Sequence, residues 1–177
     1  MEAIPNSSYS VLSPLLRFYL YGVQGFCYEV IFTAFFDFFV HDAGWELKGH
    51  SSISSFFIYG ICGFMIEHLY VFLYYKHGIQ WYWREPIYLI IVYCWEFSTG
   101  LLLRQFNACP WDYSHYPYNL MGLITLLYAP GWLFLGLVQD AVADYLLRMR
   151  VVKSPFLDSM RRIQGTQQNG ECTKLDW

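Results

Sequence analysis

Four long apolar segments alternate with short polar segments along the chain. The apolar segments cover residues 18–40, 53–75, 85–104 and 119–147. A helix of about 20 apolar residues is long enough to cross the ~30 Å hydrocarbon core of a membrane. Because the connecting segments are short, consecutive helices should lie side by side in opposite directions. The pattern therefore predicts an all-α membrane protein, built as a compact bundle of four transmembrane helices.

The predicted helical domain covers residues 15–153 and is flanked by two polar tails. Residues 1–14 are expected to form a short cytosolic tail. Residues 154–177 lack hydrophobic periodicity and are expected to form a disordered cytosolic tail. The first apolar segment is too long for a secretory signal, and no basic region precedes it. We therefore expect this segment to be retained as a transmembrane helix.

The composition supports a protein embedded in a lipid bilayer. Hydrophobic residues make up 56% of the chain and charged residues 14%, whereas a soluble domain carries about 25% charged residues. A net charge of −3 with 11 Lys and Arg disfavours nucleic-acid binding. A soluble protein of buried helices is the less favoured alternative.

The distribution of Lys and Arg predicts how the helices are oriented. With four crossings both termini share one side, and that side collects nine of the 11 basic residues. The other two, Lys48 and Arg104, fall in the segments on the opposite side. Because basic residues concentrate in cytosolic segments, both termini should be cytosolic. The count does not distinguish the endoplasmic reticulum from the plasma membrane.

The most specific pattern in the sequence is a short internal repeat. Residues 21–29 and 59–67 are identical at five of nine positions, with an offset of 38 residues. Each copy ends in a glutamate and carries two glycines on the same helix face. Small residues on one face let helix backbones approach closely in lipid. These glycines are predicted to be helix-packing positions: Gly22, Gly25, Gly60 and Gly63. The repeat indicates either an inverted duplication or ordinary packing of small residues.

Three glutamates are predicted to lie near the middle of a span, at Glu29, Glu67 and Glu96. Glu29 and Glu96 each lie 11 residues inside their segment, roughly 17 Å from its edge. An unpaired charge at that depth costs several kcal/mol. The three acids, with His68 beside Glu67, therefore form a candidate intramembrane polar site. They either bind a cation or relay protons, or they serve only as hydrogen-bonding contacts between helices.

No complete catalytic or metal-binding motif occurs in the sequence. No catalytic residue can be named, and we expect no metal ion and no cofactor. The segment between the third and fourth apolar segments is dense in residues that hold turns and pack against helix ends. It is predicted to be an exoplasmic lid loop, with ligand gating as the alternative. Its residues are Cys109, Pro110, Trp111, Asp112, Tyr113 and Ser114.

Several segments together resemble a known family. Residues 104–114 read Arg-Gln-Phe-Asn-Ala-Cys-Pro-Trp-Asp-Tyr-Ser, and they are followed by Met-Gly-Leu-Ile-Thr-Leu at 121–126. With similar motifs upstream, this pattern resembles the transmembrane protein 229 family, its B branch especially, over about residues 15–150. It is also similar to bacterial membrane proteins assigned to ABC transporters. The family's pattern has an acid where this chain has Leu127. The resemblance implies a multi-pass membrane protein but no established activity.

The sequence thus predicts a non-enzymatic membrane protein with an intramembrane carboxylate cluster. It would act as a transport component or as a membrane interaction scaffold. Since four helices are few for a carrier, a homo-oligomer or a partner membrane subunit is expected. The alternative is a small intramembrane enzyme that acts on a lipid, with the acids as general acid or base.

Overall fold

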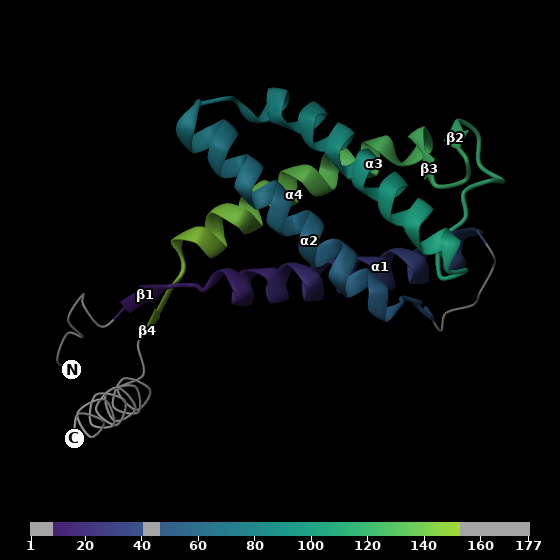
Figure 1. The fold of residues 1–177 in the computed structure, drawn as a ribbon, viewed down its shortest axis with the longest axis horizontal. Helices are drawn as coiled ribbons and strands as arrows, with labels where there is room; N and C mark the ends of the chain where they lie inside the picture. The colour runs from purple at the N-terminus through teal and green to yellow at the C-terminus, as the bar shows by residue number, and fades with distance from the viewer. Residues whose placement is uncertain (1–8, 41–46, 153–177) are drawn as a thin grey trace, which may run out of the picture. The chain divides into compact units, whose positions relative to one another are not determined.

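The computed structural model describes residues 9–40 and 47–152, which fall into two units. The larger unit, Ser13–Leu146, is helical. The described part of the smaller unit includes two short strands (Figure 1). The predicted disordered tail at 154–177 lies outside the described residues.

The described part of the chain is mostly helical, with four α-helices. They are α1 (Pro14–Val40), α2 (Ile53–Tyr70), α3 (Trp81–Gln105) and α4 (Ala129–Arg148). A π-helical turn, Val71–Lys76, extends α2, and a 3-10 turn, Leu126–Tyr128, precedes α4. Three of the resulting helices are long and apolar enough to cross a membrane: Ile53–Lys76, Trp81–Gln105 and Leu126–Arg148.

The helical unit exposes apolar side chains and buries charged ones. Ile53 is 84% exposed and Leu15 is 76% exposed, whereas Glu67 is 2% exposed and Arg84 is 5% exposed. Large exposed apolar surfaces are rare on soluble monomers. Charged side chains are seldom buried there. This distribution, with the three apolar helices, is typical of an integral membrane protein.

The segment 119–125 differs from the predicted start of the fourth span. It forms a short antiparallel hairpin of β2 (Asn119–Leu120) and β3 (Ile124–Thr125) instead of a helix. The backbone turns between the strands, where Met121 and Gly122 have φ values of 54° and 67°. The Asn119 side chain accepts a hydrogen bond from the Gly122 N–H at 3.0 Å. The segment is apolar enough to resemble a helix, but its backbone conformation excludes one.

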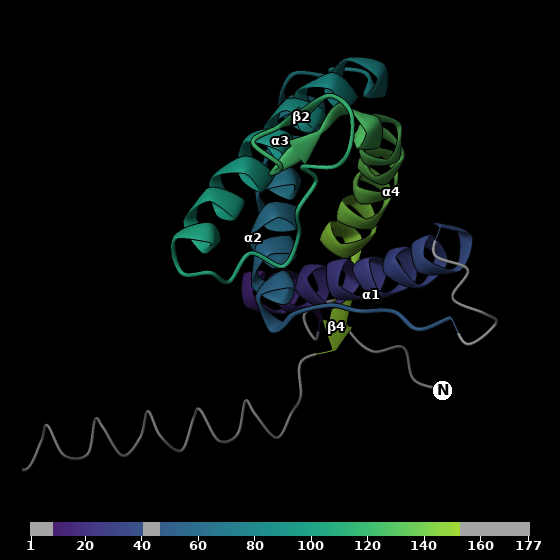
Figure 2. The same cartoon turned by 90° about the vertical axis from the view of Figure 1, so that its right-hand side faces the viewer.

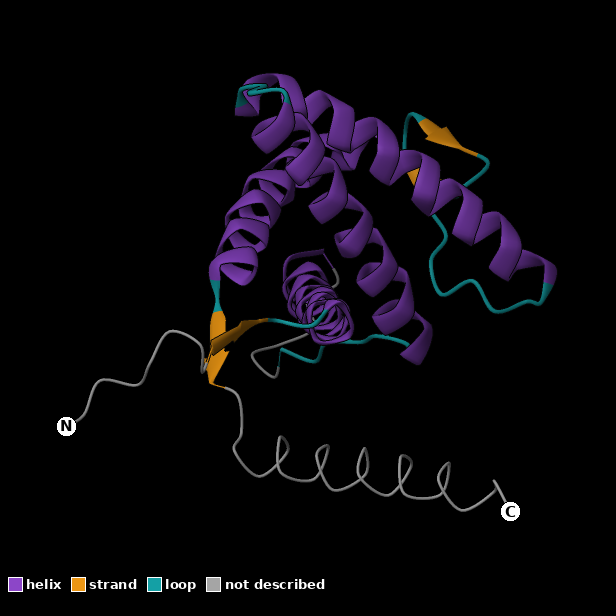
Figure 3. Ribbon diagram, turned by 60° about the vertical axis from the view of Figure 1, so that its left-hand side comes forward, coloured by secondary structure: helices purple, strands orange, loops and turns teal. Residues whose placement is uncertain are grey.

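The helices do not run parallel to a single axis. Figure 3 looks nearly along α1, whereas α2, α3 and α4 run across the page. In Figure 2, α1 crosses the page and the other three helices rise from it. Helix α2 begins part-way along α1 because the preceding loop lies against α1. There the Thr33 hydroxyl accepts a hydrogen bond from the His50 N–H at 2.8 Å and donates one to the His50 carbonyl at 2.9 Å.

The smaller unit contains a two-stranded antiparallel pairing. Strand β1 (Tyr9–Val11) pairs with β4 (Arg150–Val152), with Tyr9 opposite Val152. Residues 9–11 of the predicted N-terminal tail and residues 150–152 of the predicted helical domain therefore form strands. Both segments contain residues that favour strands, and the backbone of each supplies the hydrogen-bond partners of the other. Local sequence alone does not reveal that partnership.

Candidate functional site: a cavity between buried ion pairs

Helices α1 and α2 meet through the two copies of the internal repeat. Tyr21 packs on Gly63, where an added Cβ would lie 2.9 Å from the Tyr21 Cβ. Tyr59, 38 residues after Tyr21, packs in the same way on Gly25. The flanking phenylalanines repeat the relation, Phe18 on Gly60 and Phe56 on Gly22. Equivalent residues thus make reciprocal contacts across two antiparallel helices, as a local two-fold relation requires.

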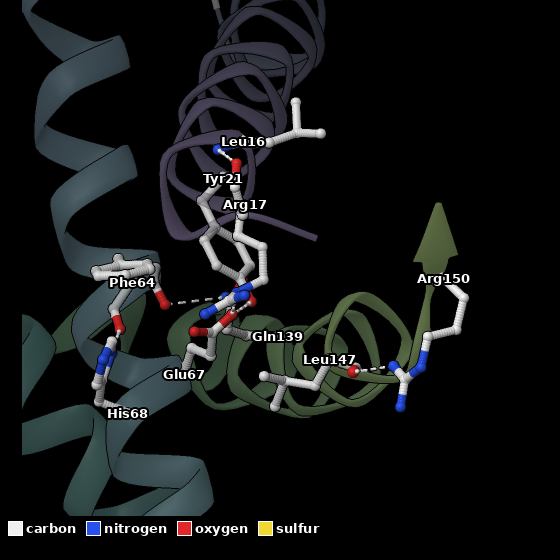
Figure 4. Close-up of polar contacts among 11 residues, drawn as sticks. Leu16, Arg17, Tyr21, Phe64, Glu67, His68, Gln139, Leu147 and Arg150 are labelled. Carbon is white, nitrogen blue, oxygen red and sulfur yellow. Dashed lines mark hydrogen bonds and ion pairs between the residues drawn. The ribbon is translucent and has the colours of Figure 1, made fainter. Parts of the chain in front are cut away.

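Glu67 lies in a buried ion pair between α1 and α2. Arg17 Nε donates to Glu67 Oε2 at 2.8 Å, and the Tyr21 hydroxyl donates to the same oxygen at 2.9 Å (Figure 4). Arg17 lies one residue before the predicted first span at 18–40 and is the fourth residue of α1. An arginine side chain is long enough to extend inward from such a position. Arg17 and Tyr21 are four residues apart and share a helix face, which is the signal that could have revealed the pair.

Each of the other two predicted glutamates accepts a hydrogen bond from a hydroxyl group of its own. Glu29 accepts a hydrogen bond from the Ser51 hydroxyl at 2.9 Å. Glu96 accepts one from the Tyr113 hydroxyl at 3.1 Å. Among the described residues, none of the three carboxylates contacts another by a hydrogen bond or shares a donor. Glu29 and Glu96 both lie near the Tyr59 side chain, so a shared polar site around these acids stays a prediction.

His68 is separate from the acid that precedes it. Its side chain is exposed, and Nδ1 lies 2.8 Å from the Phe64 carbonyl on its own helix. Figure 4 shows the His68 ring directed away from the Glu67 carboxylate. Successive residues on a helix project about 100° apart, so this separation follows from the local geometry.

A second buried ion pair joins α3 to α4. Arg84 donates through Nε to Asp140 Oδ2 at 3.1 Å, and its Nη2 contacts the same oxygen. The Tyr88 hydroxyl donates to Asp140 Oδ1 at 2.8 Å. Sequence reasoning missed this pair because Arg84 lies just before the predicted third span, and no local pattern links it to Asp140 in the middle of α4. The signals available were an aspartate inside an apolar segment and the four-residue spacing of Arg84 and Tyr88.

Tyrosines from the end of α2 surround this second ion pair. The Arg84 guanidinium lies 5.3 Å from the centre of the Tyr70 ring and 5.0 Å from that of Tyr74. The Tyr75 hydroxyl donates to Asp144 at 2.7 Å, as Tyr70 does at 3.2 Å. The π-helical turn that follows Tyr70 changes the spacing of these rings along the helix. Such turns are frequent at functional sites.

A partly open cavity of about 80 Å³, called the interior cavity below, lies between the helices and has walls from all four of them. Gln24 of α1 donates to Gln139 of α4 at 3.3 Å, and Gln139 donates to the Gly63 carbonyl at 3.4 Å. The Trp132 indole N–H lines this space and has no hydrogen-bond partner among the described residues. A water molecule needs only about 10–15 Å³ of such volume. The cavity therefore has room for a few waters or one small solute.

The predicted lid loop is docked on the ends of the helices. The Trp111 indole donates to the Leu123 carbonyl at 3.1 Å, and its ring lies against Gly100 of α3. Burial and the neighbouring Glu96 carboxylate raise the pKa of Tyr113. Hydrogen bonds from Ser114 hold the pKa of Asp112 below its ordinary value. These contacts tie the loop to α3 and to the hairpin.

A groove of about 410 Å³ follows the outer surface of this loop. Its lining includes Arg104, Cys109, Asp112 and Met121. The Arg104 guanidinium donates to the Met121 carbonyl at 2.7 Å. The Cys109 thiol lies 3.3 Å from the Trp111 carbonyl. Polar and apolar groups contribute about equally to the lining of this groove, whereas the lining of the interior cavity is mainly apolar.

One family model matches residues 16–160, and its description is "Putative ABC-transporter type IV". The chain belongs to this family. The matched range includes both buried ion pairs, the residues lining the interior cavity and the lid loop. No solved structure matches the chain. The family and the three apolar helices together fit a transport-related membrane protein.

Proposed function

We propose that this chain is a membrane component of a transport system, with its interior cavity as the solute compartment. The observation that carries the proposal is a mainly apolar cavity with two glutamine side chains in its wall, between helices whose outward faces are apolar. In lipid, buried polar groups are costly and tend to mark pathways for solutes or ions. The description of the family supports the same function.

The proposed topology has four transmembrane helices and cytosolic termini; the resemblance to the transmembrane protein 229 family implies a multi-pass membrane protein. The bias of Lys and Arg supports this orientation. Under it, Arg17 and Arg84 are near the cytosolic starts of α1 and α3. The ion pair of each arginine would then fasten a helix pair on the cytosolic side of the cavity. The lid loop would close the exoplasmic side.

A cysteine-labelling experiment tests this topology. Cys109 and Cys172 are predicted to lie on opposite sides of the membrane. Two variants that each retain only one of these thiols are treated with a membrane-impermeant maleimide. We expect Cys109 to react in intact cells and Cys172 only after permeabilisation. The reverse pattern, or equal labelling in intact cells, would contradict the proposed orientation.

A reconstitution experiment tests transport. Full-length protein in liposomes is assayed for proton flux under an imposed pH gradient and for urea permeation by light scattering. We expect at least one flux to exceed that of protein-free liposomes. Gln139→Leu, which removes amide groups from the cavity wall, should reduce it. Gln80→Leu, at the start of α3 and outside the cavity, is the matched control.

The same preparation separates the alternative functions. No flux above protein-free liposomes, or equal flux in wild type and Gln139→Leu, would contradict a solute pathway through the cavity. Turnover of membrane lipid that is lost in Glu96→Gln would instead favour the enzyme. A partner subunit or a second copy of the chain is part of the proposal because four helices are few for a carrier. Co-purification from native membranes tests this part of the proposal.

A further inference from the structure

Glu85 is a buried carboxylate without a hydrogen-bond donor. The residue is 5% exposed, and neither carboxylate oxygen has a partner among the described residues. The side chain lies against α4 at Gly136, where an added Cβ would overlap Oε2. The absence of a side chain at Gly136 thus makes room for this carboxylate between α3 and α4.

The donors around Glu85 are already directed elsewhere. Arg84 donates to Asp140 and to the Ile79 carbonyl, and the Tyr88 hydroxyl also donates to Asp140. The tyrosines at the end of α2 face the guanidinium with their rings. Glu85, Asp140 and Arg84 together carry a formal charge of −1, and Asp144 of α4 faces this group across the hydroxyls of Tyr70 and Tyr75. An uncompensated charge of this kind is strongly unfavourable away from water.

We infer that Glu85 binds one monovalent cation, either a proton or an alkali-metal ion. A single positive charge balances the group formed by Glu85, Asp140 and Arg84. Within residues 9–40 and 47–152, no three acidic, histidine or cysteine side chains are grouped as a multivalent metal ion would require. The charge count and the ligand count therefore both favour a singly charged occupant.

Occupancy of this site is coupled to the contact between α3 and α4. When the cation is bound to Glu85, Asp140 is the only carboxylate of this group that attracts Arg84. When the cation leaves, two carboxylates attract the same guanidinium, and the ion pair between α3 and α4 weakens. Glu85 lies four residues into α3, about 6 Å from its start. The site is therefore close enough to one end of the helix for exchange with the aqueous phase.

Thermal unfolding of the full-length protein in detergent tests the inference without requiring transport activity. The midpoint is followed by tryptophan fluorescence in two arms. One arm varies pH in choline chloride, and the other varies NaCl or KCl at a fixed alkaline pH. A cation that binds only the folded state raises its stability with concentration. At concentrations of the binding cation above its Kd, we expect each tenfold increase in that concentration to raise the wild-type midpoint by about 3–6 °C.

The pH arm and the salt arm distinguish a bound proton from a bound alkali-metal ion. A response to pH alone identifies a proton, and a response to Na⁺ or K⁺ at alkaline pH identifies an alkali-metal ion. Glu85→Gln keeps the size of the side chain and removes the charge, so the response should be lost and the variant should exceed wild type at alkaline pH. Other titrating groups contribute to both proteins, so the difference between the two profiles is the measurement.

A pair of glycine variants provides a second, independent test. Gly136→Ala places a methyl group where the Glu85 carboxylate lies and should abolish or shift the cation response. Gly131→Ala, on the same helix with no atom within 4 Å of the added Cβ, should keep it. The inference is overturned if wild type responds to neither pH nor salt. It is also overturned if Glu85→Gln, or Gly136→Ala where Glu85→Gln does not fold, keeps the wild-type response.

Discussion

Replacing Gly25 with alanine is expected to destabilise the contact between α1 and α2. The added Cβ would lie 2.9 Å from the Tyr59 Cδ1 and closer still to the Cβ and Cγ of that residue. These atoms are at the root of the side chain, so a rotamer change cannot move them away. Overpacking typically costs about 1–3 kcal/mol, and this geometry favours the upper end. Alanine recovers about 1 kcal/mol of helix propensity relative to glycine.

The expected net loss is therefore about 2 kcal/mol, or a thermal midpoint about 4–8 °C lower. Gly131→Ala is the matched control because its Cβ meets no atom within 4 Å. Gly63→Ala, whose Cβ would lie 2.9 Å from the Tyr21 Cβ, should give an intermediate loss. Midpoints are measured in one detergent by tryptophan fluorescence. If Gly25→Ala proved as stable as Gly131→Ala, close backbone approach at the repeat would not be what holds these helices together.

Two further predictions concern charged groups. Arg17→Gln should cost about 3–5 kcal/mol because it leaves the Glu67 carboxylate buried without its cation. Adding Glu67→Gln should restore part of that loss, and a double-mutant cycle measures the coupling. Hydrogen bonds from Ser114 lower the pKa of Asp112 below its ordinary value of 3.8. The stability that these hydrogen bonds give to the loop is therefore present above pH 3.8. It is lost as the pH falls through the lowered pKa of Asp112 in the folded protein. Near-ultraviolet circular dichroism should show this loss in wild type, and Asp112→Asn should remove the pH dependence.

Helix boundaries show where the sequence pattern was sufficient and where it was not. The predicted span 53–75 closely matches the helix Ile53–Lys76, because an uninterrupted apolar run between polar loops favours a single helix. The predicted start of the fourth span at 119 was wrong. Hydropathy does not distinguish an apolar hairpin from an apolar helix, and the positive φ values at 121 and 122 determine the difference.

The candidate site depended more strongly on tertiary structure. The sequence identified Glu67 as an intramembrane acid, but it did not reveal Arg17 as the ion-pair partner of Glu67, because Arg17 lies just before the predicted first span. Arg84 lies just before the predicted third span and Asp140 inside the fourth, and no local pattern pairs them, although they are buried together. Position along a helix gives depth alone. Contact also depends on side-chain length, on rotation about the helix axis and on how the helices cross.

The sequence alone determined the apolar segments, the unusual charge balance and the repeated glycines that let two helices approach. These features depend on composition and on local periodicity, which are properties of the chain before it folds. Tertiary structure alone determined which acid meets which base, and that Glu85 has no hydrogen-bond donor among the described residues. Those outcomes arise because crossing helices bring together residues many positions apart, and no local pattern encodes their relative rotation.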